Sequence, residues 1–336
     1  MIRRIGVLGA GAWGLTLADL LAKKGELVTV WDRNAEVLRA LARDRTRNSP
    51  VGLVVDESIT FEPDLQALAS VADVLVCAVP SYAIRALCER LRDVWSNGRR
   101  RIFVSCSKGI EENTLMLPSQ IFTDVMGKKA AHDFVVLAGP SHAEEVCRGV
   151  PTLVVCCAAE PEIANLVRDL FFRPTFRVYT QGDCKGVELG GALKNVLAIA
   201  AGGCDGLGFG DNTKAALVTR GLAELSRAAI ALGAERQTLM GLSGLGDLVV
   251  TCGSQHSRNR KFGELIARGL TPEQALDTIG AAVEGYRTAK SAHALAANIG
   301  VEMPIAATVY RILYEGISVN DALRALLERD PRPENY

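Results

Sequence analysis

Residues 5–14 read IGVLGAGAWG, a short apolar run that leads directly into the glycine pattern GxGxxG. The apolar run predicts a buried strand, and the helical spacing of apolar residues over 15–24 predicts a helix immediately after the glycines. A second strand is expected at 27–31, which completes a strand–helix–strand unit. Repetition of such units is typical of a parallel α/β sheet.

The three glycines of this pattern have separate physical roles in binding a pyrophosphate. Gly9 allows a tight turn, Gly11 lets the ligand approach the backbone, and Gly14 lets the helix pack closely on the strand. The helix N-terminus adds unpaired N–H groups and the positive end of its dipole. The alternative is a glycine turn that binds nothing, which this strand–helix context makes the weaker interpretation.

Asp32 and Arg33 follow the second strand and bear on which dinucleotide binds. A carboxylate at this position accepts hydrogen bonds from a free ribose 2′-hydroxyl, whereas an arginine neutralises a 2′-phosphate. Because both are present, we expect NADP to be used at least as well as NAD. Asp32 could equally cap the helix that follows it.

The alternation of strands and helices continues to about residue 182, with further apolar strands expected at 59–61, 74–79, 102–106, 134–137, 152–157 and 175–179. Near-continuous apolar strands separated by helices are typical of a parallel sheet covered on both faces. Beyond this point no convincing strand occurs, and helices are expected over 185–203, 212–232, 235–241, 258–268, 272–278, 284–297, 304–314 and 318–328. The sequence therefore predicts an α/β protein: an N-terminal Rossmann-type, doubly wound, mainly parallel sheet domain at 1–182 that binds the dinucleotide, followed by an all-α substrate and catalytic domain at 183–330.

Composition excludes several classes of protein. The 336 residues include 38 Lys+Arg and 38 Asp+Glu, so the formal charge is zero, and only 5% are aromatic. This balance argues against a nucleic-acid or membrane-surface binder. No apolar run is long enough for a membrane-spanning helix, so no integral membrane segment is expected.

Cysteine usage bears on the cellular compartment. The nine cysteines are odd in number, form no CxxC motif and mostly lie in apolar runs, which predicts reduced thiols in a cytoplasmic protein; they are Cys77, Cys88, Cys106, Cys147, Cys156, Cys157, Cys184, Cys204 and Cys252. The four histidines are too scattered for a metal site, and no metal is expected.

Lys194 is the first candidate for proton transfer, which an enzyme interconverting an alcohol and a ketone requires. It lies in the Gly- and Ala-rich helical stretch GGALKNV at 190–196. Burial there would lower its pKa toward the range useful for catalysis. Alternatively, its aliphatic stem could carry the ammonium group to the surface. This stretch alone leaves the two interpretations open.

Four further segments carry polar groups suited to a site. Asp247 follows a glycine-rich turn, where a turn or cap acid is the more common role. The segment Ser257-Arg258-Asn259 lies where a helix begins, and an arginine at a helix N-terminus suits a phosphate; a solvated basic turn is the alternative. Residues 105–109 and 139–143 each follow a strand, where ligands bind in such sheets.

Together these motifs resemble the bacterial NAD(P)-dependent glycerol-3-phosphate dehydrogenases over nearly the whole chain. The matching stretches are GAGAWG at 9–14, SKG at 107–109, AGPSHAEE at 138–145, GVELGGALKNVLAIAAG at 186–202, DGLGFGDNTKAAL at 205–217, LSGLGDLVVTC at 242–252, SRNRKFG at 257–263, VEGYRTAK at 283–290 and VEMPI at 301–305. Such ordered matches are far more specific than any single motif.

The resemblance implies reversible interconversion of dihydroxyacetone phosphate and sn-glycerol 3-phosphate, which supplies the phospholipid backbone. Lys194 would be the general acid/base at the substrate C2 oxygen, with Asp247 beside it. Implied substrate contacts are Lys108, Gly139, Ser141, Lys194, Asp247, Ser257, Arg258 and Asn259. Together with Gly9, Gly11, Gly14 and Asp32 of the glycine fingerprint, dinucleotide contacts are expected from Trp13, Arg33, Lys108, Ala143, Arg258, Val283 and Glu284. The resemblance also suggests a homodimer.

One stretch departs from the family pattern. The family usually carries an aromatic-Leu-Pro turn after the second helix, whereas residues 47–53 read RNSPVGL, with no aromatic. No cofactor contact is carried over to this loop.

Two rival functions fit the same general architecture. One is a 3-hydroxyacid or ketopantoate-type reductase, against which the Ser-Arg-Asn cluster at 257–259 and the Gly-Leu-Gly-Asp segment at 244–247 favour a phosphate ester. The other is a dinucleotide sensor or scaffold without catalysis, against which the joint presence of Lys194 and Asp247 argues.

Overall fold

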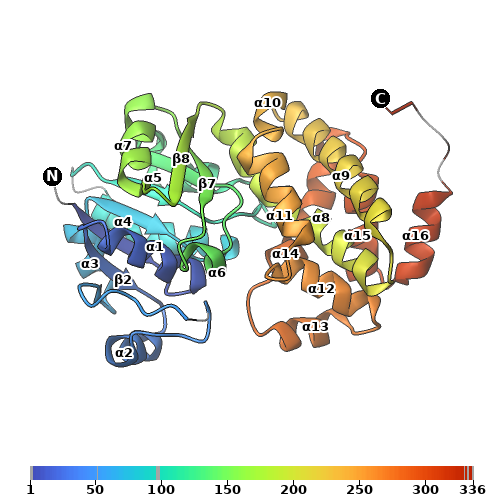
Figure 1. Cartoon of the computed structure of the whole chain (residues 1–336). Helices are drawn as coiled ribbons and strands as arrows, with labels where there is room; N and C mark the ends of the chain where they lie inside the picture. The colour runs from blue at the N-terminus through green and yellow to red at the C-terminus, as the bar shows by residue number, and fades with distance from the viewer. Residues whose placement is uncertain (1–2, 51, 96–98, 329, 331–332, 335–336) are drawn as a thin grey trace.

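The apolar run before the glycine pattern forms β1 (Arg4–Leu8), a central strand of an eight-stranded sheet. The computed structural model describes residues 3–50, 52–95, 99–328, 330 and 333–334. Within these residues the chain forms a sheet domain, drawn from blue to green, beside a helical domain, drawn from yellow to red (Figure 1). The predicted class of fold is confirmed.

The sheet has the strand order β3-β2-β1-β4-β5-β6-β7-β8. The remaining strands are β2 (Leu27–Trp31), β3 (Thr60–Phe61), β4 (Val74–Cys77), β5 (Ile102–Ser105), β6 (Phe134–Ala138), β7 (Thr152–Ala158) and β8 (Phe176–Gln181). Every neighbouring pair is parallel except β6 and β7, which run antiparallel. Because the order reverses at β1, the carboxyl ends of β1 and β4 frame the place where such sheets bind ligands.

Helices cover both faces of the sheet. They are α1 (Ala12–Ala22), α2 (Ala35–Asp44), α3 (Leu65–Val71), α4 (Ile84–Trp95), α5 (Pro118–Met126), α6 (Ala143–Val146) and α7 (Pro161–Phe171), with short 3₁₀ turns η1 (Ser81–Ala83) and η2 (Lys128–Asp133). Alternate residues of β4 enter different cores: Val74 and Val76 belong to one cluster, Leu75 and Cys77 to the other. This is why the strands read as continuous apolar runs.

The helical domain is built around α8 (Cys184–Gly206), which is buried along most of its length. Its other helices are α9 (Asp211–Ala231), α10 (Arg236–Leu239), α11 (Asp247–Gly253), α12 (Arg258–Ala267), α13 (Pro272–Ile279), α14 (Glu284–Ile299), α15 (Pro304–Tyr314) and α16 (Val319–Leu327). Helices α9, α11, α12 and α14 pack directly on α8. None of the helices in the described ranges is both long and apolar enough to span a bilayer.

The segment after α9 differs from the expected single helix at 235–241. Short α10 is followed by a π-helical turn, η3 (Leu242–Gly246), and then by α11, which was not anticipated. A Cβ at Gly244 would overlap the backbone of Leu239, so this tight reversal requires glycine. Glycines that read as helix breakers therefore direct the chain into a further helix.

One expectation about the cysteines is wrong. Cys157 in β7 and Cys184 at the start of α8 form a disulfide, with their Cα atoms 5.2 Å apart, a separation usual for disulfides. The two residues lie 27 positions apart, and only the packing of α8 against the sheet brings them together. The other seven cysteines are free. The prediction that all nine cysteines are reduced thiols is therefore wrong, and it no longer supports a reducing compartment.

Candidate active site

The glycine loop has the geometry that a dinucleotide phosphate requires. Gly9 has φ +108°, a conformation that favours glycine. A Cβ at Gly14 would overlap the Gly9 carbonyl oxygen, so the turn and α1 can approach only without a side chain. Gly11 is exposed and precedes α1, and a Cβ there would meet open space. No side chain at Gly11 therefore separates the first N–H groups of α1 from a pyrophosphate bound at the loop.

Asp32 holds this loop rather than capping α2. Its Oδ2 accepts a hydrogen bond from the Ala10 N–H at 2.8 Å, and its Oδ1 accepts one from the Asn34 N–H at 2.9 Å. Asn34 is the residue that caps α2, through the Glu36 N–H. The helix-capping alternative for Asp32 is therefore wrong, because its carboxylate fixes the peptide between the first two glycines.

Two residues expected near the dinucleotide differ in their exposure to solvent. Trp13 is half-buried against the apolar core, with its ring 6.4 Å from that of Phe176. Arg33 is exposed and makes no hydrogen bond or ion pair within the described ranges.

The loop at 47–53, which departs from the family pattern, contacts the glycine loop through Arg47. The Arg47 guanidinium donates a hydrogen bond to the Ala10 carbonyl oxygen. Val51 lies outside the described residues. The loop therefore contacts the glycine loop through an arginine, a contact that the sequence did not indicate.

A buried carboxylate joins two lysines where the domains meet. Asp247, the first residue of α11, is 1% exposed. Its Oδ1 accepts a hydrogen bond from Lys194 Nζ, and its Oδ2 accepts one from Lys108 Nζ at 2.6 Å. Lys194 comes from the middle of α8 and Lys108 from the segment after β5. The structure thus brings together three residues predicted to form the site.

Lys194 is buried, with 5% of the residue exposed, so the interpretation that it reaches the surface is wrong. Burial lowers its pKa to about 8, and the charge of Lys108 acts in the same direction, although Asp247 opposes both. Burial alone would raise the pKa of Asp247, but the two ammonium groups outweigh it and hold that pKa below its usual value. The result is an amine that can change protonation state near neutral pH.

Thr251 also contacts Lys194, although it was not among the site residues predicted from the sequence. Its Oγ1 accepts a hydrogen bond from Lys194 Nζ at 2.6 Å. Because Thr251 lies four residues after Asp247 on α11, both side chains face the same direction. The four-residue spacing indicates that Thr251 lies beside Asp247, but only if residues 247–253 are recognised as a helix.

The loop after β6 lies against the lysine–aspartate cluster. Lys108 Nζ donates to the Gly139 carbonyl oxygen at 3.1 Å, and the Ser141 hydroxyl donates to the same oxygen at 3.0 Å. Gly139 has φ +138°, a conformation that favours glycine, and a Cβ there would make a tight contact with the Val154 backbone. Ala143 is buried at the start of α6. Gly139 and Ser141 are thus joined to the cluster through Lys108.

The start of α12 is tied to α8 and α14. Ser257 caps α12 through the Arg260 N–H. Asn259 donates to Asn195 Oδ1 at 2.9 Å, and its own Oδ1 accepts from the Gly285 N–H at 2.9 Å. Arg258 is exposed and has no hydrogen bond or ion pair in the described part of the chain. Asn195, which follows Lys194, is a second positioning residue that sequence reasoning missed.

The N-terminus of α14 contacts the sheet domain. Val283 is buried and precedes Glu284, whose carboxylate accepts hydrogen bonds from the Ser81 N–H and hydroxyl. Burial raises the pKa of Glu284. Ser81 follows β4, and the carboxyl ends of the strands form the edge of the sheet that binds ligands. Glu284, which is expected to contact the dinucleotide, therefore lies at that edge.

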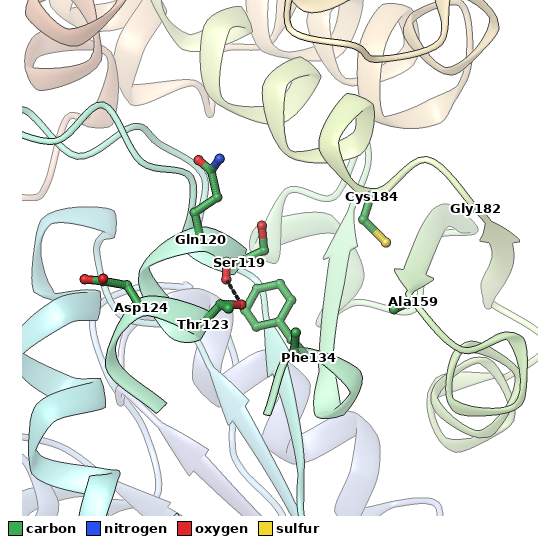
Figure 2. A pocket seen from close by; sticks show the side chains of 9 residues that line it. Ser119, Gln120, Thr123, Asp124, Phe134, Ala159, Gly182 and Cys184 are labelled. Carbon is green, nitrogen blue, oxygen red and sulfur yellow. Dashed lines mark hydrogen bonds between the residues drawn. The ribbon is translucent and has the colours of Figure 1, made fainter. Parts of the chain in front are cut away.

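A separate hollow of about 570 Å³ lies beside the disulfide (Figure 2). In Figure 2 Ser119 and Thr123 project from α5, while Gly182 and Cys184 border the opposite side. None of its lining residues belongs to the expected site.

Comparison with known proteins places these features in a family. Residues 4–164 match the family model described as "NAD-dependent glycerol-3-phosphate dehydrogenase N-terminus", and residues 183–324 match the corresponding C-terminus model.

Similar proteins carry related names. Glycerol-3-phosphate dehydrogenase [NAD(P)+] of Carboxydothermus hydrogenoformans is 45% identical, with 98% of each chain covered. The protein of the same name from Moorella thermoacetica is 46% identical, covering 98% of this chain and 97% of that one. The crystal structure of glycerol-3-phosphate dehydrogenase from Coxiella burnetii superposes with a TM-score of 0.92 at 34% identity, covering 98% of this chain and 99% of that one. The chain therefore belongs to the NAD-dependent glycerol-3-phosphate dehydrogenase family, whose members are NAD(P)-dependent oxidoreductases that act on a CH–OH group.

Proposed function

We propose that this chain reduces dihydroxyacetone phosphate to sn-glycerol 3-phosphate, with Lys194 giving the proton to the C2 oxygen. The observation that carries the proposal is the hydrogen bonding of buried Lys194 to Asp247, at the meeting point of the two domains. An amine with a pKa of about 8 can serve as acid in one direction and as base in the other.

The chain's own residues supply the proton and the electrostatic field. A bound nicotinamide supplies the hydride. As negative charge develops on the C2 oxygen, the Lys194 ammonium stabilises it and then donates its proton. Asp247 and Thr251 accept hydrogen bonds from Lys194 and so fix the direction of its amine. In the reverse reaction the neutral amine takes the proton from the alcohol.

The proposed roles of the remaining residues follow from where their groups lie. Arg258, exposed at the N-terminus of α12, is assigned to the substrate phosphate, because a cation and a helix N-terminus both favour an anion. The other proposed substrate contacts are Lys108, Gly139, Ser141, Lys194, Asp247, Ser257 and Asn259. The proposed dinucleotide contacts are Gly9, Gly11, Trp13, Gly14, Asp32, Arg33, Lys108, Ala143, Arg258, Val283 and Glu284.

NADP is proposed to be used at least as well as NAD. The exposed Arg33, which has no ion pair in the described ranges, can neutralise a 2′-phosphate, while the Asp32 oxygens already accept two backbone N–H groups. Comparing kcat/KM for NADPH and NADH tests this, and a strong preference for NADH would contradict it.

Four broader proposals complete the functional picture. We propose that the boundary between the dinucleotide-binding and catalytic domains lies at 182/183, between β8 and α8. The product is proposed to supply phospholipid synthesis. A cytoplasmic location is proposed. A homodimer is also proposed, and light scattering coupled to gel filtration tests it.

The decisive assay is oxidation of NADPH by the purified protein, with and without dihydroxyacetone phosphate. Parallel reactions with ketopantoate and a 3-keto acid test the rival reductases. We expect oxidation only with the phosphorylated triose. Turnover with a keto acid alone, or binding of NADPH without turnover of any substrate, would refute the proposal.

A further inference from the structure

The side chain of His142 lies in the candidate active site, close enough to Lys194, Lys108 and Asp247 for their charges to act on its imidazole. Its Nε2 is buried and unpaired among the described residues. His142 occupies the position before α6, yet its side chain does not cap that helix. A buried imidazole nitrogen without a partner costs free energy, so such a group at a site is a candidate for binding a ligand.

The chain on the N-terminal side of His142 is held at the lysine–aspartate cluster. Lys108 Nζ and the Ser141 hydroxyl both donate to the Gly139 carbonyl oxygen. Lys108 in turn binds Asp247. The loop that carries His142 is therefore fixed beside the group proposed to move the proton.

On its other side, His142 faces the segment proposed to bind phosphate. Its ring centroid lies 5.9 Å from that of His256, with the ring planes tilted by 57°. His256 directly precedes Ser257 and Arg258 at the start of α12. His142 belongs to the sheet domain and His256 to the helical domain, so the two rings meet across the domain boundary.

The charge state of His142 follows from its surroundings. Burial lowers its pKa, and the ammonium groups of Lys194 and Lys108 lower it further, against the opposing effects of Glu144 and Asp247. The ring is therefore neutral at pH 7 and carries one N–H donor. A phosphate oxygen, which only accepts, is the matching partner.

We propose that Nε2 of His142 donates a hydrogen bond to the phosphate of the substrate and so favours phosphorylated over free trioses. This inference rests on the proposed function, in which Lys194 donates a proton to the C2 oxygen of the substrate and Arg258 binds the same phosphate as His142. The role is one of binding, so loss of His142 should weaken substrate affinity with little effect on turnover.

Two substitutions separate hydrogen bonding from packing. His142→Phe keeps a ring but removes both nitrogens, and His142→Gln restores a donor. We expect His142→Phe to raise KM for dihydroxyacetone phosphate roughly tenfold with kcat within about twofold, and His142→Gln to recover part of the loss. His256→Phe, which retains a ring beside His142, is the matched control, expected to change KM by less than about twofold. The affinity for NADPH, measured by fluorescence, reports folding and should not change.

A second readout needs no substitution. Imidazole ¹⁵N NMR of the wild-type NADP⁺ complex should show the pKa of His142 rising when glycerol 3-phosphate is added, because a phosphate stabilises the imidazolium. Glycerol, which lacks the phosphate, should leave that pKa unchanged.

The outcomes separate this inference from the proposed function. A normal KM in His142→Phe, or a His142 pKa that glycerol 3-phosphate does not move, would overturn the role of His142 while leaving the enzyme active. A wild-type protein that neither reduces dihydroxyacetone phosphate nor binds glycerol 3-phosphate would overturn both.

Discussion

Lys108 of the sheet domain donates a 2.6 Å hydrogen bond from Nζ to Oδ2 of Asp247 in the helical domain. The other oxygen of that carboxylate accepts from Lys194, so one buried anion is shared by cations from both domains. Breaking a buried pair of this kind leaves an uncompensated charge, which is strongly unfavourable. The relative placement of the domains and the charge state of Lys194 are therefore linked through Asp247.

Removing the charge of Asp247 should make Lys194 a weaker base. Asp247 raises the pKa of Lys194, whereas burial and Lys108 lower it, so Asp247→Asn should lower that pKa further. The reduction needs the ammonium form, so the alkaline fall of kcat/KM should move to lower pH by about one unit or more, with kcat down about 10–100-fold. Thr251→Val removes a neutral hydrogen bond and should shift the profile less. An unshifted profile in Asp247→Asn would contradict the coupling.

Arg258 should act on binding rather than on turnover. It lies at the N-terminus of α12, exposed and without an ion pair in the described ranges. Arg258→Ala should raise KM for dihydroxyacetone phosphate about 10–100-fold with a smaller change in kcat, because the lost contact is made in both ground and transition states. Steady-state kinetics check this, with NADPH saturating. A fall in kcat at constant KM would exclude the phosphate role.

Glu188 makes the stability of the fold depend on pH. It is buried in α8, and its Oε1 accepts a hydrogen bond from the Ser119 N–H at 2.8 Å while its Oε2 accepts one from the Ser119 hydroxyl at 2.5 Å. Burial raises its pKa from 4.5 to about 7. The folded state therefore binds this proton more tightly than the unfolded state, and the free energy of unfolding falls as pH rises from about 4.5 to about 7.

Glu188→Gln should remove this dependence. At pH 8 the variant should be more stable than the wild type by about 1–2 kcal/mol, since an amide carries no charge to bury, and the advantage should vanish toward pH 5. Urea unfolding at the two pH values measures the difference. The same stability difference at both values would show that the Glu188 carboxyl does not titrate as its burial implies.

Arg47 should strengthen dinucleotide binding by holding the glycine loop. Its guanidinium donates to the Ala10 carbonyl oxygen while Asp32 accepts from the Ala10 N–H, so both backbone polar groups of Ala10 are held. Arg47→Ala should weaken NADPH binding about 3–10-fold, measured as Kd by fluorescence titration. Arg43→Ala, which removes an exposed arginine paired with Asp44, is the control. Equal Kd values in wild type and Arg47→Ala would mean that this contact has no effect on the loop.

Local patterns were enough to predict most of the fold. Apolar runs such as 74–79 predicted strands because both faces of the sheet are covered, and the glycine pattern at 9–14 predicted the turn because its geometry requires glycine. The reversed direction of β7 was not foreseen, since a continuous apolar strand reads alike in either direction. The disulfide between Cys157 and Cys184 was missed for a related reason, because tertiary packing brings the pair together.

The residues of the candidate site were likewise only partly predictable from the sequence. Lys194 and Asp247 were singled out from their unusual surroundings in the sequence, but their burial and contact emerge only when α11 packs on α8. Ser81 and Asn195 were missed because serine and asparagine are ordinary surface residues, and only their partners across the fold show what they position. Chemistry-bearing residue types were thus visible in sequence, whereas the groups that orient them were not.

The most direct test of the account is hydride transfer by Lys194→Ala in a single turnover, followed by the loss of NADPH absorbance with saturating dihydroxyacetone phosphate. Asp247 keeps Lys108 as its partner in this variant, so the fold and the affinity for NADPH should be preserved. The account predicts a rate at least about 10³-fold below wild type, because both the proton donor and its charge are lost. A rate within about tenfold of wild type, with NADPH bound normally, would contradict the role of Lys194.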